Sequence, residues 1–179
     1  MFLQYFLVVL AGAAGADAST AAGPPGERDI QHWINRHAHQ VHALEVPAAR
    51  QRVVGDLDGD GRHDVAVLYT LKSRSAPGGE SRYLAAFKQQ RAATGKDRSK
   101  QGRDNRQETL RYHAHVLVSG PGAGEANRVT ILDRTLVVEM LTFAPGDAAC
   151  CPTRASTRRY RLGAQALTLV RSASARHTR

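Results

Sequence analysis

The chain has 179 residues, enough for one domain of ordinary size with its own core and too few for a multi-blade repeat array. Apolar residues make up 42% of the sequence, aromatic residues 6%, and the mean hydropathy is -0.39, values typical of a soluble globular domain rather than a membrane protein. Lys and Arg number 25 against 16 Asp and Glu, which gives a formal net charge of +9 at pH 7.

The N-terminal segment predicts a leader followed by a linker. The apolar run Phe2–Ala14 is too short to span a bilayer, and the small residues Ala16–Ala18 form a cleavage site for a signal peptide over residues 1–18. We therefore expect a periplasmic or secreted protein whose mature form has no transmembrane segment. Because no Lys or Arg precedes the apolar run, an uncleaved anchor or a different start codon is the alternative. The Gly- and Pro-containing residues 19–26 predict a linker.

The rest of the sequence predicts one helix followed by a series of strands. Apolar residues recur at three- and four-residue spacing over Glu27–Leu44, which indicates an amphipathic helix that Pro47 ends. Short turns at Asp133–Arg134 and Gly163–Ala164 favour antiparallel hairpins. We expect a single α+β domain over 27–171, with the N-terminal amphipathic helix packed on a mainly antiparallel β-sheet. Runs of β-branched and aromatic residues predict strands at 51–55, 65–71, 82–87, 111–118, 128–132, 135–143, 157–162 and 166–170.

Two segments carry most of the excess positive charge. Residues 88–109 are polar throughout, Lys and Arg outnumber the acids, and the composition predicts a mobile basic loop between strands. From Arg154 onward the chain contains arginines and no acid, and residues 172–179 are expected to form a disordered tail. These segments are candidates for binding an anionic envelope polymer or another protein. They lack interleaved aromatic residues, which argues against specific nucleic-acid recognition; a solvated surface without a partner is the alternative.

Carboxylates recur at alternate positions just before the second predicted strand. If Asp56 is position 1, Asp58, Asp60 and Asp64 fall at positions 3, 5 and 9, and Gly61 falls at position 6. This is the spacing of a calcium loop, in which carboxylates and one backbone carbonyl converge on a hard cation and the glycine permits a sharp turn. A solvated turn rich in Asp and Gly is the alternative interpretation.

The segment Val53–Tyr69 resembles the calcium loop of FG-GAP or VCBS-type repeats, in which Asp-x-Asp-x-Asp-Gly-x-x-Asp joins two strands. The resemblance implies that Ca²⁺ is bound by the carbonyl of Arg62 and by the side chains of Asp56, Asp58, Asp60 and Asp64. The loop occurs once, so the multi-blade propeller of that family is not expected.

The position at which an EF-hand has a bidentate Glu is Val67, and strand-forming residues surround it. The loop therefore leads into a strand. The later segment Leu141–Leu162 resembles the C-terminal part of small exported bacterial proteins that also carry such a loop, a resemblance that implies compartment and fold rather than activity.

Cys150 and Cys151 are adjacent in the sequence. Disulfides persist outside the reducing cytosol, and Cα atoms about 3.8 Å apart allow a strained bond between neighbours. We expect a vicinal disulfide that forms a rigid turn, stiffened by Pro152, and that is structural rather than a redox centre because the Cys-x-x-Cys spacing is absent. Two free thiols that bind a soft metal ion, or a bond to another chain, are the alternatives.

The histidines form no diagnostic metal motif. His113 and His115 are expected to share one strand face, and four other histidines lie on the predicted helix. Either group is a candidate for zinc or copper, but no Cys or carboxylate stands at a diagnostic spacing, which favours surface and core histidines. The helix histidines are His32, His37, His39 and His42.

No catalytic motif occurs in the sequence, which contains no G-x-S-x-G, H-E-x-x-H, Walker loop or G-x-G-x-x-G. Whether the protein is an enzyme is left open, and no catalytic residue is nominated. We expect an exported Ca²⁺-binding structural or binding module of the bacterial envelope. A small secreted hydrolase, with a site that forms only in the folded protein, is the alternative.

Overall fold

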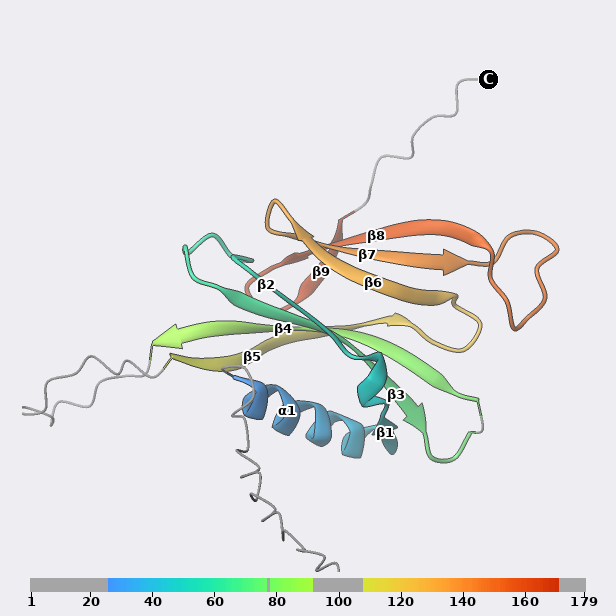
Figure 1. The fold of residues 1–179 in the computed structure, drawn as a ribbon, viewed down its shortest axis with the longest axis horizontal. Coiled ribbons are helices and arrows are strands. Elements are labelled where there is room, and N and C mark those ends of the chain that lie inside the picture. The colour runs from blue at the N-terminus through green and yellow to red at the C-terminus, as the bar shows by residue number, and fades with distance from the viewer. Residues whose placement is uncertain (1–25, 77, 92–107, 171–179) are drawn as a thin grey trace, which may run out of the picture.

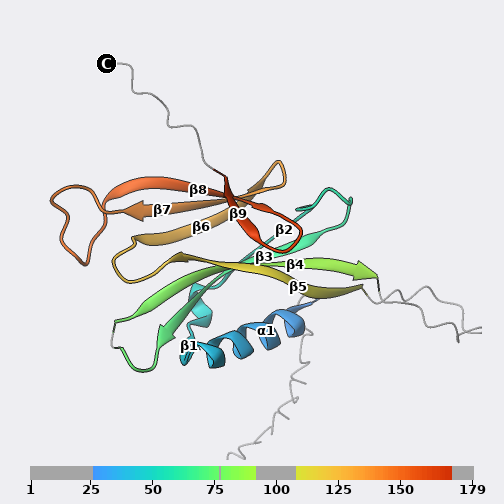
Figure 2. The same ribbon diagram turned by 180° about the vertical axis from the view of Figure 1, so that it is seen from behind.

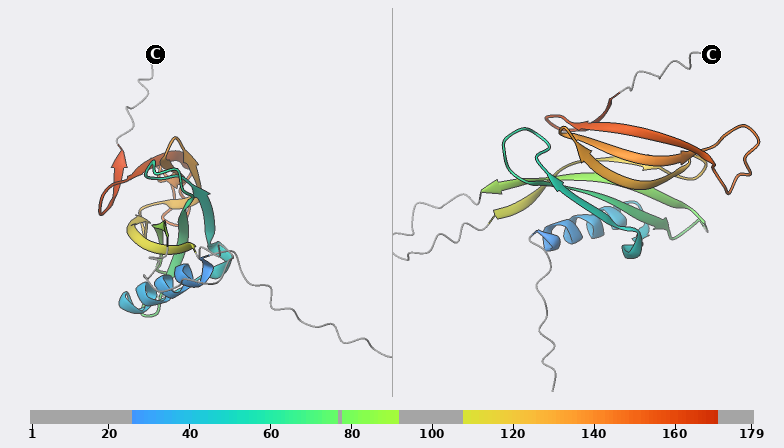
Figure 3. Two further views of the ribbon diagram at one scale, coloured as in Figure 1. Left: turned by 90° about the vertical axis from the view of Figure 1, so that its left-hand side faces the viewer. Right: turned by 45° about the horizontal axis from the view of Figure 1, so that its top comes forward.

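The computed structural model describes residues 26–76, 78–91 and 108–170. Within these residues the chain forms three layers: one helix, a middle sheet and a second sheet, with all strand pairs antiparallel (Figures 1 and 3). The helix is α1 (Glu27–Gln40), and a 3₁₀ turn spans Pro47–Ala49. The middle sheet contains β1 (Ala43–Glu45), β2 (Gln51–Gly55), β3 (Asp64–Ser73), β4 (Glu80–Arg91) and β5 (Glu108–Ser119). The second sheet contains β6 (Glu125–Leu132), β7 (Thr135–Thr142), β8 (Arg154–Leu162) and β9 (Leu167–Val170).

A helix packed on antiparallel sheet confirms the expected α+β character. The sequence did not predict the division into two sheets: β6 to β9 form a separate sheet that packs on the face of the middle sheet opposite α1.

The helix packs on the middle sheet through the apolar residues that predicted it. Ile30, Trp33 and Ile34 are buried against β3 and β4. The helix ends at Gln40, earlier than expected, because His42 adopts a left-handed conformation with φ 51°. The chain then reverses into β1, which pairs with the end of β3, and this long-range pairing overrides the helical spacing of the sequence.

Strand β3 lies at the centre of the fold and is buried along most of its length. Alternate residues, such as Val67 and Tyr69, face α1, and the intervening Ala66 and Leu68 face the second sheet. Both faces are covered, which explains why the sequence of β3 is a continuous apolar run rather than an alternating one.

Side chains at the edges join the two sheets in addition to the apolar core between them. Gln51 of β2 donates from Nε2 to the Asn127 carbonyl at 2.5 Å and accepts the Val129 N–H at 3.2 Å. Arg158 of β8 donates to the Val118 carbonyl at 2.5 Å. Figure 2 shows the reverse side, where β9 follows β8.

The basic loop is shorter than expected. β4 continues through Lys88 to Arg91 and β5 begins at Glu108, so that Arg91 pairs with Glu108. The remainder of that segment, the expected signal peptide and almost all of the linker, and the expected tail lie outside the described residues. No helix among the described residues is long and apolar enough to cross a membrane.

Candidate metal centre

The acidic loop connects β2 to β3 at one end of their hairpin. Its base is closed by the pairing of Gly55 with Asp64. Gly59 and Gly61 have φ angles of 88° and 79°, a left-handed conformation that favours glycine. The two glycines therefore permit the tight turns of the loop.

Three of the predicted ligands come together. Asp56, Asp58 and Asp64 each offer a carboxylate oxygen, and the three oxygens lie within 4.8 Å of one another. Calcium binds oxygens at about 2.3–2.6 Å, so oxygens on opposite sides of one ion are up to about 5 Å apart. The size of the group thus fits a single hard cation.

Backbone N–H groups hold two of these carboxylates in place. Asp56 accepts hydrogen bonds from Gly59 N at 2.6 Å and Gly61 N at 3.0 Å. Asp58 accepts one from Asp60 N at 3.1 Å. The loop is therefore organised by its own backbone N–H groups.

Asp64 is the buried member of the group, with 1% of its surface exposed. Its carboxylate accepts the Leu57 N–H and the Gln89 N–H, both at 3.1 Å, which joins the loop to β4. Burial raises the pKa of the Asp64 carboxyl and nearby Asp58 and Asp60 add to this effect, while the two N–H donors oppose it. A cation beside Asp64 would favour the ionised form.

Positive side chains lie against the loop, a feature that the sequence did not predict. Lys88 of β4 places Nζ 2.8 Å from Asp58 Oδ2, and this hydrogen bond is the largest cause of the lowered pKa of Asp58. The Arg134 guanidinium packs so closely over Gly59 that a Cβ atom there would collide with it. The acidic loop and the residues assigned to the basic loop are therefore in direct contact at Lys88.

Asp60 is not part of the three-carboxylate group. Asp60 accepts the Arg62 N–H at 2.9 Å, and its carboxylate lies 3.8 Å from the Arg62 guanidinium. Both side chains are exposed, so this pair adds little to the organisation of the group.

An open groove of about 640 Å³ lies beside the loop. Among the described residues, its lining includes Arg62, His63, Gln89 and Leu110, and no acidic residue.

A β-bulge in β5 separates the two strand histidines, which were expected on one face. Ala86 pairs with Ala114 and Phe87 with Tyr112, so His113 is the extra residue and the alternation of side chains shifts there. His113 donates from Nε2 to the Gly163 carbonyl at 2.8 Å, near the second sheet, whereas His115 lies on the α1 side.

His115 joins His37 of α1 in an aromatic cluster. Their ring centroids are 4.7 Å apart, His37 Nδ1 is 2.8 Å from the Tyr69 hydroxyl, and His115 Nδ1 is 2.7 Å from the Tyr112 hydroxyl. Burial lowers the pKa of both histidines, and the charge of His115 lowers that of His37 further. Trp33 stacks on Tyr112 with centroids 4.4 Å apart. The cluster packs α1 on the sheet.

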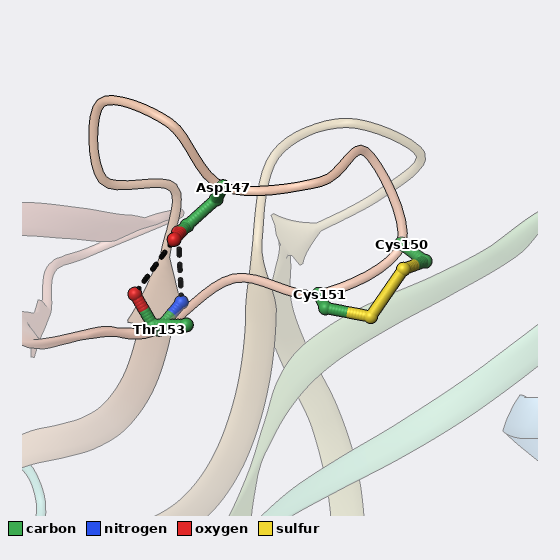
Figure 4. Close-up of a disulfide and its surroundings, with 4 residues drawn as sticks. All are labelled: Asp147, Cys150, Cys151 and Thr153. Atoms are coloured by element: carbon green, nitrogen blue, oxygen red, sulfur yellow. Dashed lines mark hydrogen bonds between the residues drawn. A yellow bond between two sulfur atoms is a disulfide. The ribbon is translucent and has the colours of Figure 1, made fainter.

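The cysteine pair lies far along the chain from the acidic loop, in the connection between β7 and β8. The two sulfur atoms are bonded to each other, and both residues are exposed (Figure 4).

Comparisons of the chain with protein-family models, curated proteins and solved structures found no match. The fold and the site therefore define a class only: an α+β domain with a helix on two antiparallel sheets and one group of three carboxylates at a strand junction.

Proposed function

We propose that the protein is an exported Ca²⁺-binding module of the bacterial envelope, periplasmic or secreted, in which the cation stabilises the β2–β3 junction. The observation that carries the proposal is the buried Asp64 carboxylate with oxygens of Asp56 and Asp58 within 4.8 Å. The FG-GAP-like spacing of the loop and the predicted signal peptide support the choice of calcium and of the compartment.

The role of the cation is structural. Asp64 already bonds to the backbone of β4 through Gln89 N, so an ion on this carboxylate would connect the loop, β3 and β4. Affinity is expected at about 10⁻⁴ to 10⁻³ M, as in extracellular modules. At ten times the Kd, calcium would then stabilise the fold by about 1.4 kcal/mol.

Thermal unfolding of the mature protein in millimolar Ca²⁺ and in EDTA, with Mg²⁺ as a comparison, tests the proposal. We expect a higher melting temperature in Ca²⁺ and heat in a calcium titration. Asp58→Asn should abolish both effects, and Glu139→Gln on the second sheet should leave them unchanged. Equal melting temperatures in Ca²⁺ and EDTA, with no heat, would contradict calcium binding.

For a partner we propose an anionic envelope polymer bound to the outer face of the second sheet. Arg128, Arg159 and Arg161 are exposed there, and none forms an ion pair with a described residue. The neighbours of Arg159 across the strands are the uncharged Val137 and Val170. Arg128 lies opposite Glu139, whereas Arg161, like Arg159, has only uncharged neighbours across the strands. Guanidinium groups without acidic neighbours on an open face favour non-specific attraction of a polyanion.

A further inference from the structure

The β7–β8 connection carries the disulfide at a distance from the residues that hold the connection together. Figure 4 shows the Asp147–Thr153 pair on one side of the loop and the Cys150–Cys151 bond on the other. Both cysteines are exposed, and the loop projects beyond the ends of the two strands (Figure 1).

Hydrogen bonds that involve no sulfur atom also hold the loop. The Asp147 carboxylate accepts hydrogen bonds from Ala144 N at 2.7 Å, Thr153 N at 2.9 Å and Thr153 Oγ1 at 2.8 Å. A backbone bond from Cys151 N to the Ala148 carbonyl at 2.9 Å forms the turn that contains the cysteines. These bonds use no sulfur atom, so they remain possible when the disulfide is open.

The base of the loop is also closed independently. Thr142 pairs with Arg154 at the ends of β7 and β8, and the Thr142 hydroxyl donates to the Arg154 carbonyl at 3.2 Å. The strands therefore fix where the loop begins and ends.

The disulfide cannot stabilise the fold in the usual way. A disulfide stabilises mainly by restricting the unfolded chain, and the effect grows with the number of residues enclosed. Cys150 and Cys151 are neighbours, so their bond encloses no intervening residue. Because both residues are exposed, the bond adds no core packing either. The bond can therefore stiffen only the turn that contains it, the structural role expected from the sequence, and that turn has hydrogen bonds of its own. The alternative is a local chemical role at an accessible position.

We propose that Cys150–Cys151 is a redox-gated dithiol site that binds a thiophilic metal or metalloid ion when it is reduced. The two sulfur atoms belong to adjacent residues of one turn, so two thiolates released there stay close enough to chelate one soft ion. This inference concerns a different part of the molecule from the calcium site and does not depend on it.

The opening step is thiol–disulfide exchange with a dithiol reductant. A thiolate of the reductant attacks one cysteine sulfur, which forms a mixed disulfide and releases the other cysteine as a thiolate. The second thiol of the reductant then displaces the first cysteine and closes the disulfide of the reductant. Two electrons pass to the protein sulfurs, and the two protons of the reductant's thiol groups balance the two thiols formed.

Phenylarsine oxide is the probe for the reduced site. Its arsenic(III) forms bonds to both sulfur atoms, and the two thiol protons leave with the oxide oxygen as one water molecule, so no oxidation occurs. A single thiol cannot form this cyclic product. The probe therefore distinguishes a pair of adjacent thiols from an isolated one.

The experiment compares the oxidised and the reduced mature protein. Reduction should raise the intact mass by about 2 Da, and reoxidation should restore it. The melting temperature should change by no more than about 2 °C. The arsenical should bind the reduced protein with one-to-one stoichiometry and should not bind the oxidised protein, Cys150→Ser or Cys151→Ser.

The double variant Cys150→Ser/Cys151→Ser controls for loop structure. It should have the same melting temperature as the oxidised protein. Unfolding or a fall of many degrees on reduction would make the disulfide structural and overturn the proposal. A native disulfide that dithiols do not open, or a reduced pair that fails to bind the arsenical, would also overturn it.

Discussion

Lys88 Nζ lies 2.8 Å from Asp58 Oδ2, so an ammonium group of β4 occupies one side of the candidate metal site. This relationship gives the acidic loop a counter-charge of its own. It also makes Lys88 a competitor of any cation that needs the Asp58 carboxylate.

Lys88→Met is therefore expected to raise calcium affinity by a factor of about 1.4 to 5, because a partly exposed ion pair is worth about 0.2–1 kcal/mol. Isothermal titration at moderate ionic strength measures the change. Lys88→Arg keeps the positive charge and should bind calcium like the unmodified protein. An affinity for Lys88→Met that is unchanged or weaker would show that Lys88 does not compete with the cation.

Asp64→Asn should destabilise the protein even without metal. The Leu57 and Gln89 N–H groups bind different carboxylate oxygens of Asp64, and Asn replaces one of these oxygens with an NH2 donor. One buried N–H group then loses its acceptor, which costs about 1–3 kcal/mol. Urea unfolding in EDTA measures this loss. Asp60→Asn, at an exposed position, is the matched control; an equal loss in both variants would contradict the structural role of Asp64.

The pKa shift of Asp64 also predicts a pH dependence. Its carboxyl has a pKa above the ordinary 3.8, so the folded state binds the proton more tightly than the unfolded state. The stabilising contribution is complete below pH 3.8 and is lost as pH rises through the folded-state pKa. Difference curves of stability against pH between the protein and Asp64→Asn, recorded in EDTA, should show this slope. Calcium should reduce it by favouring the ionised carboxylate.

The histidine cluster should give a slope of the opposite sign near neutrality. His37 and His115 have pKa values below the ordinary 6.5, so the unfolded chain takes up protons first as pH falls. Their contribution is complete above pH 6.5, falls as pH drops below it, and levels off below the folded-state pKa. Trp33, the single tryptophan, reports the unfolding by fluorescence. His115→Gln should flatten the curve, whereas His32→Gln, at an exposed position of α1, should not.

Arg158 and Arg159 are adjacent in β8 but have different roles. Arg158 bonds the Val118 carbonyl between the sheets, whereas Arg159 is exposed on the outer face. We expect Arg159→Gln with Arg161→Gln to lower the salt concentration that elutes the protein from a heparin column, because fewer counterions are released. Arg158→Gln should lower stability with a smaller effect on retention. If the unmodified protein and both variants elute at the same salt concentration, the outer face is not the binding surface.

Local sequence signals predicted the parts of the fold that depend on neighbouring residues. The strand Gln51–Gly55 and the turn at Asp133–Arg134 were both predicted correctly, the latter with φ angles of 47° and 58° and with Leu132 paired to Thr135. The alternate spacing of the aspartates likewise predicted that Asp56 and Asp58 lie close together. Each of these features is decided within a few residues of the chain.

Features that depend on strand register could not be predicted in this way. The bulge at His113 shifts the alternation of β5, so the partner of His115 is His37 on α1. The position of Lys88 beside Asp58 depends on the pairing of β3 with β4, which the polar composition after Phe87 obscured. The division into two sheets likewise follows from packing of the whole chain rather than from any local pattern.

The burial of β3 on both faces has a consequence for hydrogen exchange. Amides of residues such as Ala66 and Leu68 are paired with β2 and β4 and covered by the layers above and below, so they should exchange only when the whole domain opens. Their exchange rates then report the global free energy of unfolding, whereas amides in the β7–β8 connection exchange through local opening. Calcium at Asp64 should slow exchange throughout β3, and opening of the Cys150–Cys151 bond should leave β3 unchanged.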